Sequence, residues 1–349
     1  MLFGKLLGLI SLDMGVDLGT TNTLVCVKGR GIVLSEPSVV AVKKGTNQVL
    51  LNGNAVGTVA REIMAKAPDD AVAVWPLKDG VITDFEITEA MLGYFLRKAH
   101  SRKWAARPRV VFAVPCEISA VEKRAITVAA EHAGAGKVYL IEEPIAAAIG
   151  MGMDLGKEGA KMTVNIGGGT TQVAILSRQG IMVSRTLRVA GDQMDEAIRK
   201  YVRERYNLLI GEGSAEKVKI EIGSAYEPSE EMSLEIKGVD ATAGLPRRVV
   251  INAAEVYEAL SAPVGAIVDA IKTAVEACPP EAARELRNDG MMLCGGALLR
   301  GIDRAIMEAT GIPAHIADNP MTVVARGTAR ILEEIDTLSQ ALEEGQSPA

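Results

Sequence analysis

The chain has 349 residues, of which 48% are hydrophobic, and a formal net charge of -6. This length exceeds the size at which a single hydrophobic core stops growing, so we expect two domains or two duplicated halves. The acidic balance and the lack of a block of Lys and Arg exclude nucleic acid as the main partner, because phosphate backbones are bound by a concentrated basic surface.

The cysteines and histidines do not form a metal or disulfide framework. The 4 cysteines include no CxxC pair, and the 3 histidines have no ligand spacing. We therefore expect a reducing cytoplasmic location, cysteines that fill the core, and no zinc site. These residues are Cys26, Cys116, Cys278, Cys294, His100, His132 and His315.

The first ten residues form a short amphipathic segment, and no apolar run in the chain reaches the roughly 18 residues that cross a bilayer. Lys5 stands among apolar residues at near-helical spacing, which is typical of an interfacial membrane anchor. A signal peptide is disfavoured because no small-residue cleavage site follows, whereas a leader that packs on its own domain is an open alternative. The predicted anchor residues are Leu2, Phe3, Leu6 and Leu7.

A strand, a turn of small residues and a second strand follow. The turn contains Gly19, Thr20, Thr21 and Asn22, and small residues let backbone N–H groups approach phosphate oxygens. Asp17, at the end of the first strand, can hold a hydrated Mg²⁺ against the phosphates.

The rest of the first half alternates strands and helices. Ser119, with Glu122 three residues later, forms a capping box that predicts a helix start, and Glu143-Pro144 opens an alanine-rich helix. The predicted strands are 32–34, 38–42, 110–114 and 139–141, and the predicted helices are 54–66, 87–102, 119–130 and 145–149.

The second half begins with the same pattern. Residues 164–172 read as a strand, a glycine turn and a strand, with Asn165 at the position of Asp17. The turn residues are Gly167, Gly168, Gly169 and Thr170. The predicted strands are 162–165, 172–176, 181–188, 232–236 and 248–251, and the predicted helices are 195–206, 214–222 and 253–277, the last kinked or split at Pro263.

A third turn follows the buried strand 291–294, where Gly295-Gly296 leads into a helix and lets a flat ring or a phosphate lie against the backbone. Both halves thus contain a β-meander followed by βαβ units. The sequence predicts an α/β fold with mixed sheets, duplicated around a central cleft.

These residues resemble the actin, sugar kinase and heat-shock ATPase superfamily, whose two phosphate loops and adenosine loop match the three turns in order. Within it, the chain is similar to the bacterial actins that organise cell-wall synthesis in rod-shaped cells. The matching stretches are 17–24, 32–40, 79–82, 141–150, 207–212 and 297–301.

The resemblance implies a duplicated actin-like (ribonuclease H-like) fold, with two domains of two subdomains each around a nucleotide cleft. Domain I would comprise residues 1–147, with a smaller subdomain at 36–76 and a C-terminal helix at 331–349 packed on it. Domain II would comprise 148–330, with a smaller subdomain at about 190–252.

The resemblance also implies ATP or ADP with Mg²⁺, Glu143 as the residue that orients the attacking water, and Asp17 as a metal ligand through water. The remaining cofactor-binding residues would be Gly19, Thr20, Thr21, Asn22, Asn165, Gly167, Gly168, Gly169, Thr170, Glu216, Lys217, Val218, Lys219, Gly295, Gly296, Ala297 and Leu298.

Besides Ser35, where the family usually has Asn, three positions around the second and third turns depart from the family pattern. The family usually has Asp at Asn165, Glu at Gln172 and Gly at Cys294, and the first two changes remove negative charge beside the metal and the water. Asn can hydrogen-bond a metal-bound water but cannot act as a base. We therefore expect ATP binding with slow hydrolysis.

By the same resemblance, the protein would form filaments at the inner face of the cell membrane and work with cell-wall synthesis and shape proteins. Trp104 stands in the basic stretch 101–107, which suits a bilayer interface, although a Trp packed on its own domain is the alternative. Val121 and Glu122, expected to be exposed, would pair two protofilaments antiparallel.

Two other functions of the same fold are weighed. A soluble sugar or acetate kinase needs a base for the acceptor hydroxyl and a polar substrate pocket, and neither forms a readable motif here. A chaperone-type ATPase is disfavoured because no peptide-binding domain follows within the 349 residues.

Overall fold

The computed structural model describes residues 13–66, 69–100, 107–296, 298–334 and 343–344. Contacts divide the chain into two compact units: residues up to Leu155 with those from Thr322 onward form the first, and Gly156–Met321 form the second. The resemblance places these boundaries after residues 147 and 330. No helix in the described ranges is both long and apolar enough to cross a bilayer.

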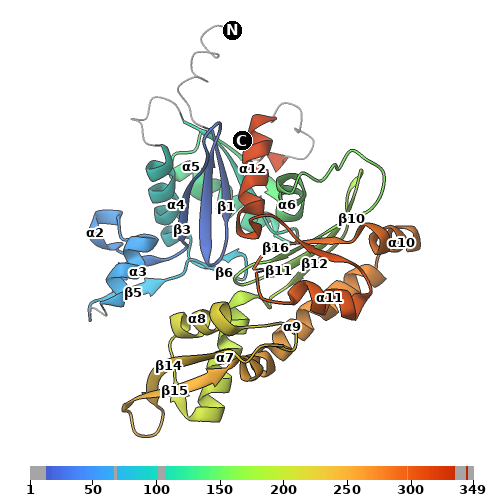
Figure 1. Ribbon diagram of the computed structural model, residues 1–349. Helices are drawn as coiled ribbons and strands as arrows, with labels where there is room; N and C mark the ends of the chain where they lie inside the picture. The colour runs from blue at the N-terminus through green and yellow to red at the C-terminus, as the bar shows by residue number, and fades with distance from the viewer. Residues whose placement is uncertain (1–12, 67–68, 101–106, 297, 335–342, 345–349) are drawn as a thin grey trace. The chain divides into compact units, whose positions relative to one another are not determined.

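The first unit is built on a sheet with the strand order β18-β9-β8-β1-β2-β3 (Figure 1). β1, β2 and β3 pair antiparallel, whereas β1, β8 and β9 run parallel. The predicted meander and βαβ unit are thereby confirmed. The strands are β1 (Met14–Leu18), β2 (Asn22–Val27), β3 (Gly31–Pro37), β8 (Arg109–Val114), β9 (Lys137–Glu142) and β18 (Glu343–Glu344).

Four helices cover this sheet, with α4 (Phe85–His100) and α5 (Ala120–His132) on one face and α6 (Glu143–Gly150) and α12 (Val323–Glu333) on the other (Figure 1). The α5 capping box is confirmed, because the Ser119 hydroxyl accepts from the Glu122 N–H and the Glu122 carboxylate accepts from the Ser119 N–H. Met14 and Val16 belong to the core under α4 and α5. Alternate residues of a strand face opposite sides, so Gly15 and Asp17 face α6 and α12.

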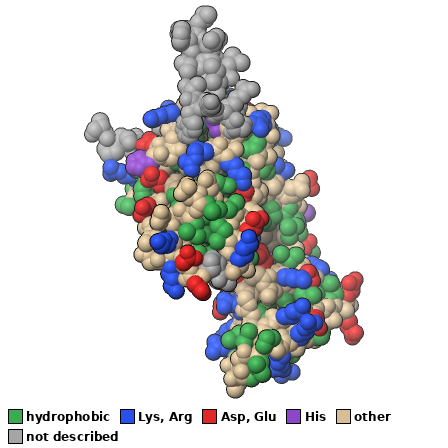
Figure 2. All heavy atoms as spheres, turned by 90° about the vertical axis from the view of Figure 1, so that its left-hand side faces the viewer, with side chains coloured by type: hydrophobic (Ala, Val, Ile, Leu, Met, Phe, Trp, Pro, Cys, Tyr) green, Lys and Arg blue, Asp and Glu red, His purple; other side chains and the backbone are tan. Residues whose placement is uncertain are grey.

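A small group of elements extends from the first sheet and contains its own core of Val39, Ala41, Ala55 and Ala60. Figure 2, which faces the side that carries these elements, shows hydrophobic side chains gathered among charged ones. The elements are β4 (Val40–Lys43), α2 (Leu50–Gly53), α3 (Thr58–Ala65) and β5 (Ala71–Val74), followed by the hairpin β6 (Leu77–Lys78) and β7 (Val81–Ile82).

The second unit repeats the topology of the first in a sheet with the order β12-β11-β10-β16-β17. β10, β11 and β12 pair antiparallel, and β10, β16 and β17 run parallel. The predicted duplication is therefore present in strand order as well as in sequence. The strands are β10 (Lys161–Ile166), β11 (Thr171–Ser177), β12 (Gly180–Leu187), β16 (Met291–Gly295) and β17 (Ala314–Ile316).

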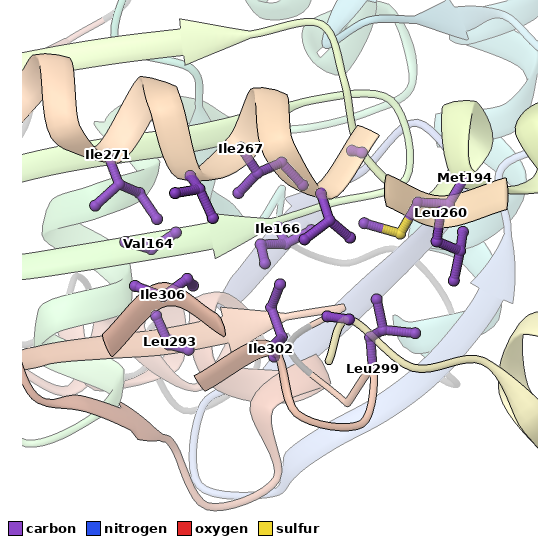
Figure 3. Packing of buried hydrophobic residues seen from close by; sticks show 14 of the residues in the cluster. Val164, Ile166, Met194, Leu260, Ile267, Ile271, Leu293, Leu299, Ile302 and Ile306 are labelled. Atoms are coloured by element: carbon purple, nitrogen blue, oxygen red, sulfur yellow. The ribbon is translucent and has the colours of Figure 1, made fainter. Parts of the chain in front are cut away.

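The core of the second unit lies between β10 and β16 and two helices, α9 (Ala253–Glu276) and α11 (Ile302–Thr310). Figure 3 shows side chains of this cluster from all four elements: Val164, Ile166, Leu293, Ile267, Ile271, Ile302 and Ile306. Because Val164 and Ile166 face this core, Asn165 faces the opposite side of the sheet.

The smaller part of the second unit packs α7 (Gly191–Tyr206) and α8 (Glu212–Ile222) with a sheet of β13 (Leu208–Leu209), β14 (Ser233–Asp240) and β15 (Pro246–Asn252). α10 (Pro280–Asp289) lies between α9 and β16 in the chain.

Two expectations differ from the structure, and a third is narrowed by it. Of the kink or split expected at Pro263, the split is absent: α9 is one helix with the buried Pro263 inside it, because the apolar face of α9 continues on both sides of the proline. α10 was not predicted, because the pair Pro279-Pro280 is interpreted as the end of the preceding helix. Pro is also tolerated in the first turn of a helix, and Pro280 begins α10. The expected helix 331–349 is wrong in extent: α12 ends at Glu333, after its last buried residue Leu332, and residues 343–344 pair with β9 as a strand.

Candidate functional site

The first glycine turn joins β1 to β2. A methyl group added at Gly19 would lie 2.6 Å from the Asn22 carbonyl oxygen, so the turn closes only without a side chain there. The Thr20 hydroxyl accepts a hydrogen bond from the Gly80 N–H at 3.2 Å, which connects the turn to the β6–β7 hairpin. Two of the candidate phosphate-loop residues are thus held in place by backbone contacts.

The hydroxyl groups of Ser38 and Thr23 also hold the first turn in place, a role that the sequence did not indicate. The Ser38 hydroxyl donates to the Gly19 carbonyl at 2.6 Å, and its oxygen lies 2.8 Å from the hydroxyl oxygen of Thr23. The Ser38 N–H donates to the Thr21 carbonyl at 2.9 Å. Ser and Thr are common at strand ends, so only the pairing of β2 with β3 reveals this function.

Asp17 lies at the end of β1 with the apolar Leu24 opposite it on β2. Removal of its carboxylate from water raises the pKa of Asp17 to about 7. A partly buried carboxylate at the edge of a sheet, beside a turn without side chains, fits a hydrated divalent cation, because a cation would compensate the lost solvation. In the described part of the chain, no cluster of three His, Cys, Asp or Glu side chains forms a direct metal site.

Glu143 is in the first turn of α6, directly after β9. β1, β8 and β9 are parallel, with Asp17 beside Ala113 and Ala113 beside Ile141, so their carboxyl ends meet at one edge of the sheet. Asp17 faces the side of the sheet that α6 covers. The structure therefore brings Asp17 and Glu143 to the same edge and the same face.

The carboxyl end of β8 contributes Cys116 to this edge. Burial, together with the charges of Glu142 and Glu143, raises the pKa of Cys116 to about 12. The thiol is therefore neutral at physiological pH, which agrees with the expectation that the cysteines act as apolar filler.

α6 and α12 approach each other more closely than side chains allow. A methyl group at Gly150 would overlap the Val323 carbonyl, and one at Gly327 would overlap the Ala146 carbonyl. α12 also contacts β2, where the Cys26 thiol donates to the Ala325 carbonyl at 3.1 Å. The position of Glu143 at the start of α6 thus depends on α12.

The second glycine turn joins β10 to β11 with the same geometry as the first. The Gly167 N–H donates to the Thr170 carbonyl at 2.8 Å, and a methyl group at Gly167 would lie 2.9 Å from that oxygen. The buried Thr171 hydroxyl donates to the Val189 carbonyl at 2.7 Å.

The start of α7 also holds the second turn. The Gly191 N–H donates to the Gly167 carbonyl at 3.2 Å, and the Asp192 N–H donates to the Gly168 carbonyl at 2.8 Å. The backbone of the turn is therefore coupled to the N-terminus of a helix.

Asn165 lies opposite Gln172 on β11 and beside Cys294 on β16. The Cys294 thiol donates to Asn165 Oδ1 over 3.6 Å, and Gln172 is buried. These three departures from the family pattern are therefore neighbours, whereas the fourth, Ser35, lies on β3.

The third turn follows β16, which pairs with β10, the strand that leads into the second turn. Gly295 has a φ of 68°, and the Gly296 N–H donates to the Ile166 carbonyl. The Leu298 side chain is 63% exposed. Ala297 lies outside the described residues, so its predicted role is not addressed by the structure.

The four predicted adenosine-segment residues on α8 have different environments. Glu216 is partly buried, Lys217 is exposed with its ammonium 3.7 Å from Glu221, and Val218 is fully buried in the core. Lys219 Nζ lies 2.8 Å from Asp195 Oδ2 and 3.1 Å from the Gly191 carbonyl. The side chain of Val218 is therefore not available to a ligand, and Asp195 is a partner that the sequence did not indicate.

The predicted surface residues are only partly described. Val121 is 79% exposed, as expected, whereas Glu122 is only partly exposed because its carboxylate caps α5. The predicted membrane residues Leu2, Phe3, Leu6, Leu7 and Trp104 lie outside the described ranges.

Comparisons with known proteins agree on one group. Residues 11–340 match the family model described as MreB/Mbl protein. The cell shape-determining protein MreB of Escherichia coli (strain K12) is 47% identical over 334 residues, which cover 95% of this chain and 96% of that protein. The cell shape-determining protein Mbl of Bacillus subtilis (strain 168) is 44% identical over 327 residues, which cover 93% and 97%.

Solved structures give the same result. The crystal structure of MreB5 of Spiroplasma citri bound to ADP has a TM-score of 0.88 and 34% identity, and covers 95% of this chain and 98% of its own. The structure bound to AMPPNP has a TM-score of 0.87 and 35% identity. A MamK double helical filament, with a TM-score of 0.77 and 24% identity, shares the fold.

Proposed function

This chain belongs to the MreB/Mbl family of cell shape-determining, actin-like proteins, and on that premise we propose that it binds ATP and polymerises into filaments that help to set rod shape. The observation that carries the proposal is the pair of equivalent glycine turns, each at the carboxyl edge of a sheet with the same strand order. Homologous crystal structures bound to ADP and AMPPNP support nucleotide binding at this fold.

The residues present fit ATP with Mg²⁺. The backbone N–H groups of residues 19–22 and 167–170 would hold the phosphates, and Asp17 would hold the hydrated cation. Gly295, Gly296, Leu298 and the exposed side of α8 would lie beside the adenosine. A bound Mg²⁺ would neutralise phosphate charge.

Glu143 is the candidate general base. Glu143 lies at the start of α6, at the same edge of the sheet as Asp17. Its carboxylate would accept the proton of the attacking water. Asn165 and Gln172 add no negative charge to the second half, so we propose that hydrolysis is slow relative to nucleotide binding.

Membrane association is the next part of the proposal. Residues 2–10 and Trp104 would bind the inner surface of the cell membrane by their apolar side chains. Deletion of 2–10 combined with Trp104→Ala is expected to abolish binding to anionic liposomes and leave nucleotide binding intact. Trp75→Ala is the matched control, because Trp75 is 47% exposed and lies outside the predicted anchor.

We also propose that the filaments pair antiparallel through α5, on which Val121 is exposed, and that they organise cell-wall synthesis. Val121→Glu is expected to give single filaments in place of pairs, because two carboxylates would meet across the interface. Filaments that remain paired would place the contact elsewhere.

The deciding experiment is sedimentation of the purified protein with and without ATP and Mg²⁺, on and off anionic liposomes, followed by electron microscopy of the pellet. Paired filaments on lipid that need ATP are the expected result. A protein that binds ATP and stays in solution under all conditions would contradict the proposal and favour a small-molecule kinase.

A further inference from the structure

The ion pair between Asp195 on α7 and Lys219 on α8 connects two parts of the candidate site within the second unit. Lys219 Nζ is shared between Asp195 Oδ2, at 2.8 Å, and the Gly191 carbonyl, at 3.1 Å. The two side chains are only 17% and 16% exposed. This lysine is therefore already held by two acceptors at the N-terminus of α7.

The same helix start holds the second phosphate turn. The N–H groups of Gly191 and Asp192 donate to the carbonyls of Gly167 and Gly168, at 3.2 and 2.8 Å. A continuous series of contacts thus runs from α8, through Lys219 and Gly191, to the turn that would hold the phosphates.

The pair is shielded from water. Asp195 Oδ1 is buried and accepts no hydrogen bond from the described residues. Desolvation raises the pKa of Asp195 to about 6, with Glu216 and Asp192 adding to this shift and Lys219 opposing it. Removal of one partner would leave the other charge poorly compensated in a partly buried place, so the position of the two helices depends on both.

We propose that Asp195 and Lys219 are positioning residues that fix α8 against the start of α7 and thereby hold the second phosphate turn in its binding geometry, so that Lys219 acts through Asp195 and Gly191 and not by contact with the nucleotide. This inference rests on the proposed ATP binding. It also assigns Lys219 a role different from the one that its place in the adenosine segment suggests.

A double-mutant cycle distinguishes the two roles. Lys219→Met, Asp195→Asn and the double variant are compared with the wild type for ADP affinity by calorimetry and for adenosine affinity by competition. If Lys219 acts through Asp195, each single variant lowers ADP affinity about tenfold, and the double variant is no weaker than either. Adenosine affinity stays the same, because adenosine does not contact the phosphate turn.

Lys200→Met and Glu204→Gln form the matched control cycle. This pair also joins a lysine to a carboxylate on α7, at 4.0 Å, but both side chains are exposed, so no effect on ADP affinity is expected. Lys219→Arg keeps the cation and is expected to restore most of the affinity, which separates positioning from a general loss of folding.

Direct contact would give a different pattern. If Lys219→Met weakens ADP binding as much in the Asp195→Asn background as in the wild type, or weakens adenosine binding, the inference is wrong. It is also wrong if both single variants bind ADP as the wild type does. A wild-type protein that does not bind ADP would overturn the proposed function itself.

Discussion

In the first unit the strand before the glycine turn ends in a carboxylate, Asp17, opposite the apolar Leu24, whereas the equivalent position in the second unit is Asn165, opposite Gln172. The two turns close in the same way, on a glycine whose added methyl group would meet a carbonyl oxygen three residues later. The backbone of the turn is thus duplicated between the two units, but the charge beside it is not. Any cation-holding function is concentrated in the first unit.

The largest effect is expected from closing the turns with a side chain. Gly19→Ala and Gly167→Ala would place a methyl group 2.6 and 2.9 Å from a backbone oxygen, so the loop must move. Such overpacking costs about 1–3 kcal/mol, which corresponds to a loss of ATP affinity of roughly five- to 150-fold if the cost falls on the binding conformation of the loop. The shorter contact predicts the larger loss for Gly19→Ala.

Calorimetric titration with ATP measures both losses. Gly265→Ala in α9 is the control, because a methyl group there meets no atom within 4 Å and the helix favours Ala. Equal and small effects of all three variants would mean that the turns do not contact phosphate.

The charge difference predicts a pH dependence from Asp17 for which Asn165, at the equivalent position, has no counterpart. Without Mg²⁺ and nucleotide, burial raises the pKa of Asp17 from its ordinary value of 3.8, which applies to the unfolded chain, to about 7 in the native protein. The native state then binds more protons than the unfolded state between these pH values, so the free energy of unfolding falls as pH rises through this window.

Asp17→Asn removes this term. The variant is expected to have a higher Tm than the wild type at pH 8, by about 2–4 °C for each kcal/mol of relieved desolvation, and the difference should shrink towards pH 5. Mg²⁺ with ATP should reverse the order at pH 8, because the cation stabilises the ionised carboxylate. A constant difference at all pH values would argue against a titrating Asp17.

The buried hydroxyl groups of Thr171 and Thr23, which follow the two turns, predict a smaller difference between the units, in the free energy of unfolding. Thr171→Val removes the donor to the Val189 carbonyl and is expected to cost about 1–3 kcal/mol. Thr23→Val should cost less, about 0.5–1.5 kcal/mol, because Ser38 still donates to the Gly19 carbonyl. Urea unfolding measures both, with the exposed Thr46→Val as control. The reverse order would show that Ser38 depends on Thr23.

The smallest effect is expected from restoring the missing charge. Asn165→Asp should raise ATP turnover a few-fold and leave nucleotide affinity nearly unchanged, because the added carboxylate acts on the metal and the water, not on the phosphate-binding backbone. Steady-state phosphate release measures the change. Unchanged or slower turnover would contradict the idea that this position weakens hydrolysis.

Sequence reasoning found the two turns because their pattern of small residues repeats and is local. It also found the capping box of α5, whose two members are three residues apart. It could not find Asp195 as the partner of Lys219 or Ser38 as the support of Gly19, because those contacts arise from packing between separate elements. It missed the burial of Val218 for a related reason: one helical position says little about which side faces the core.

The backbone contact between α6 and α12 has a consequence for how the chain folds during synthesis. The first unit is discontinuous, and Gly327 and Ala325, which pack on α6 and β2, are translated only after all of Gly156–Met321. The second unit is one continuous segment and can fold on the ribosome as a whole. Until α12 has left the ribosome, we expect the sheet face that α12 covers to stay exposed in the nascent first unit. Glu143 would take its final place only after residue 333 has left the ribosome.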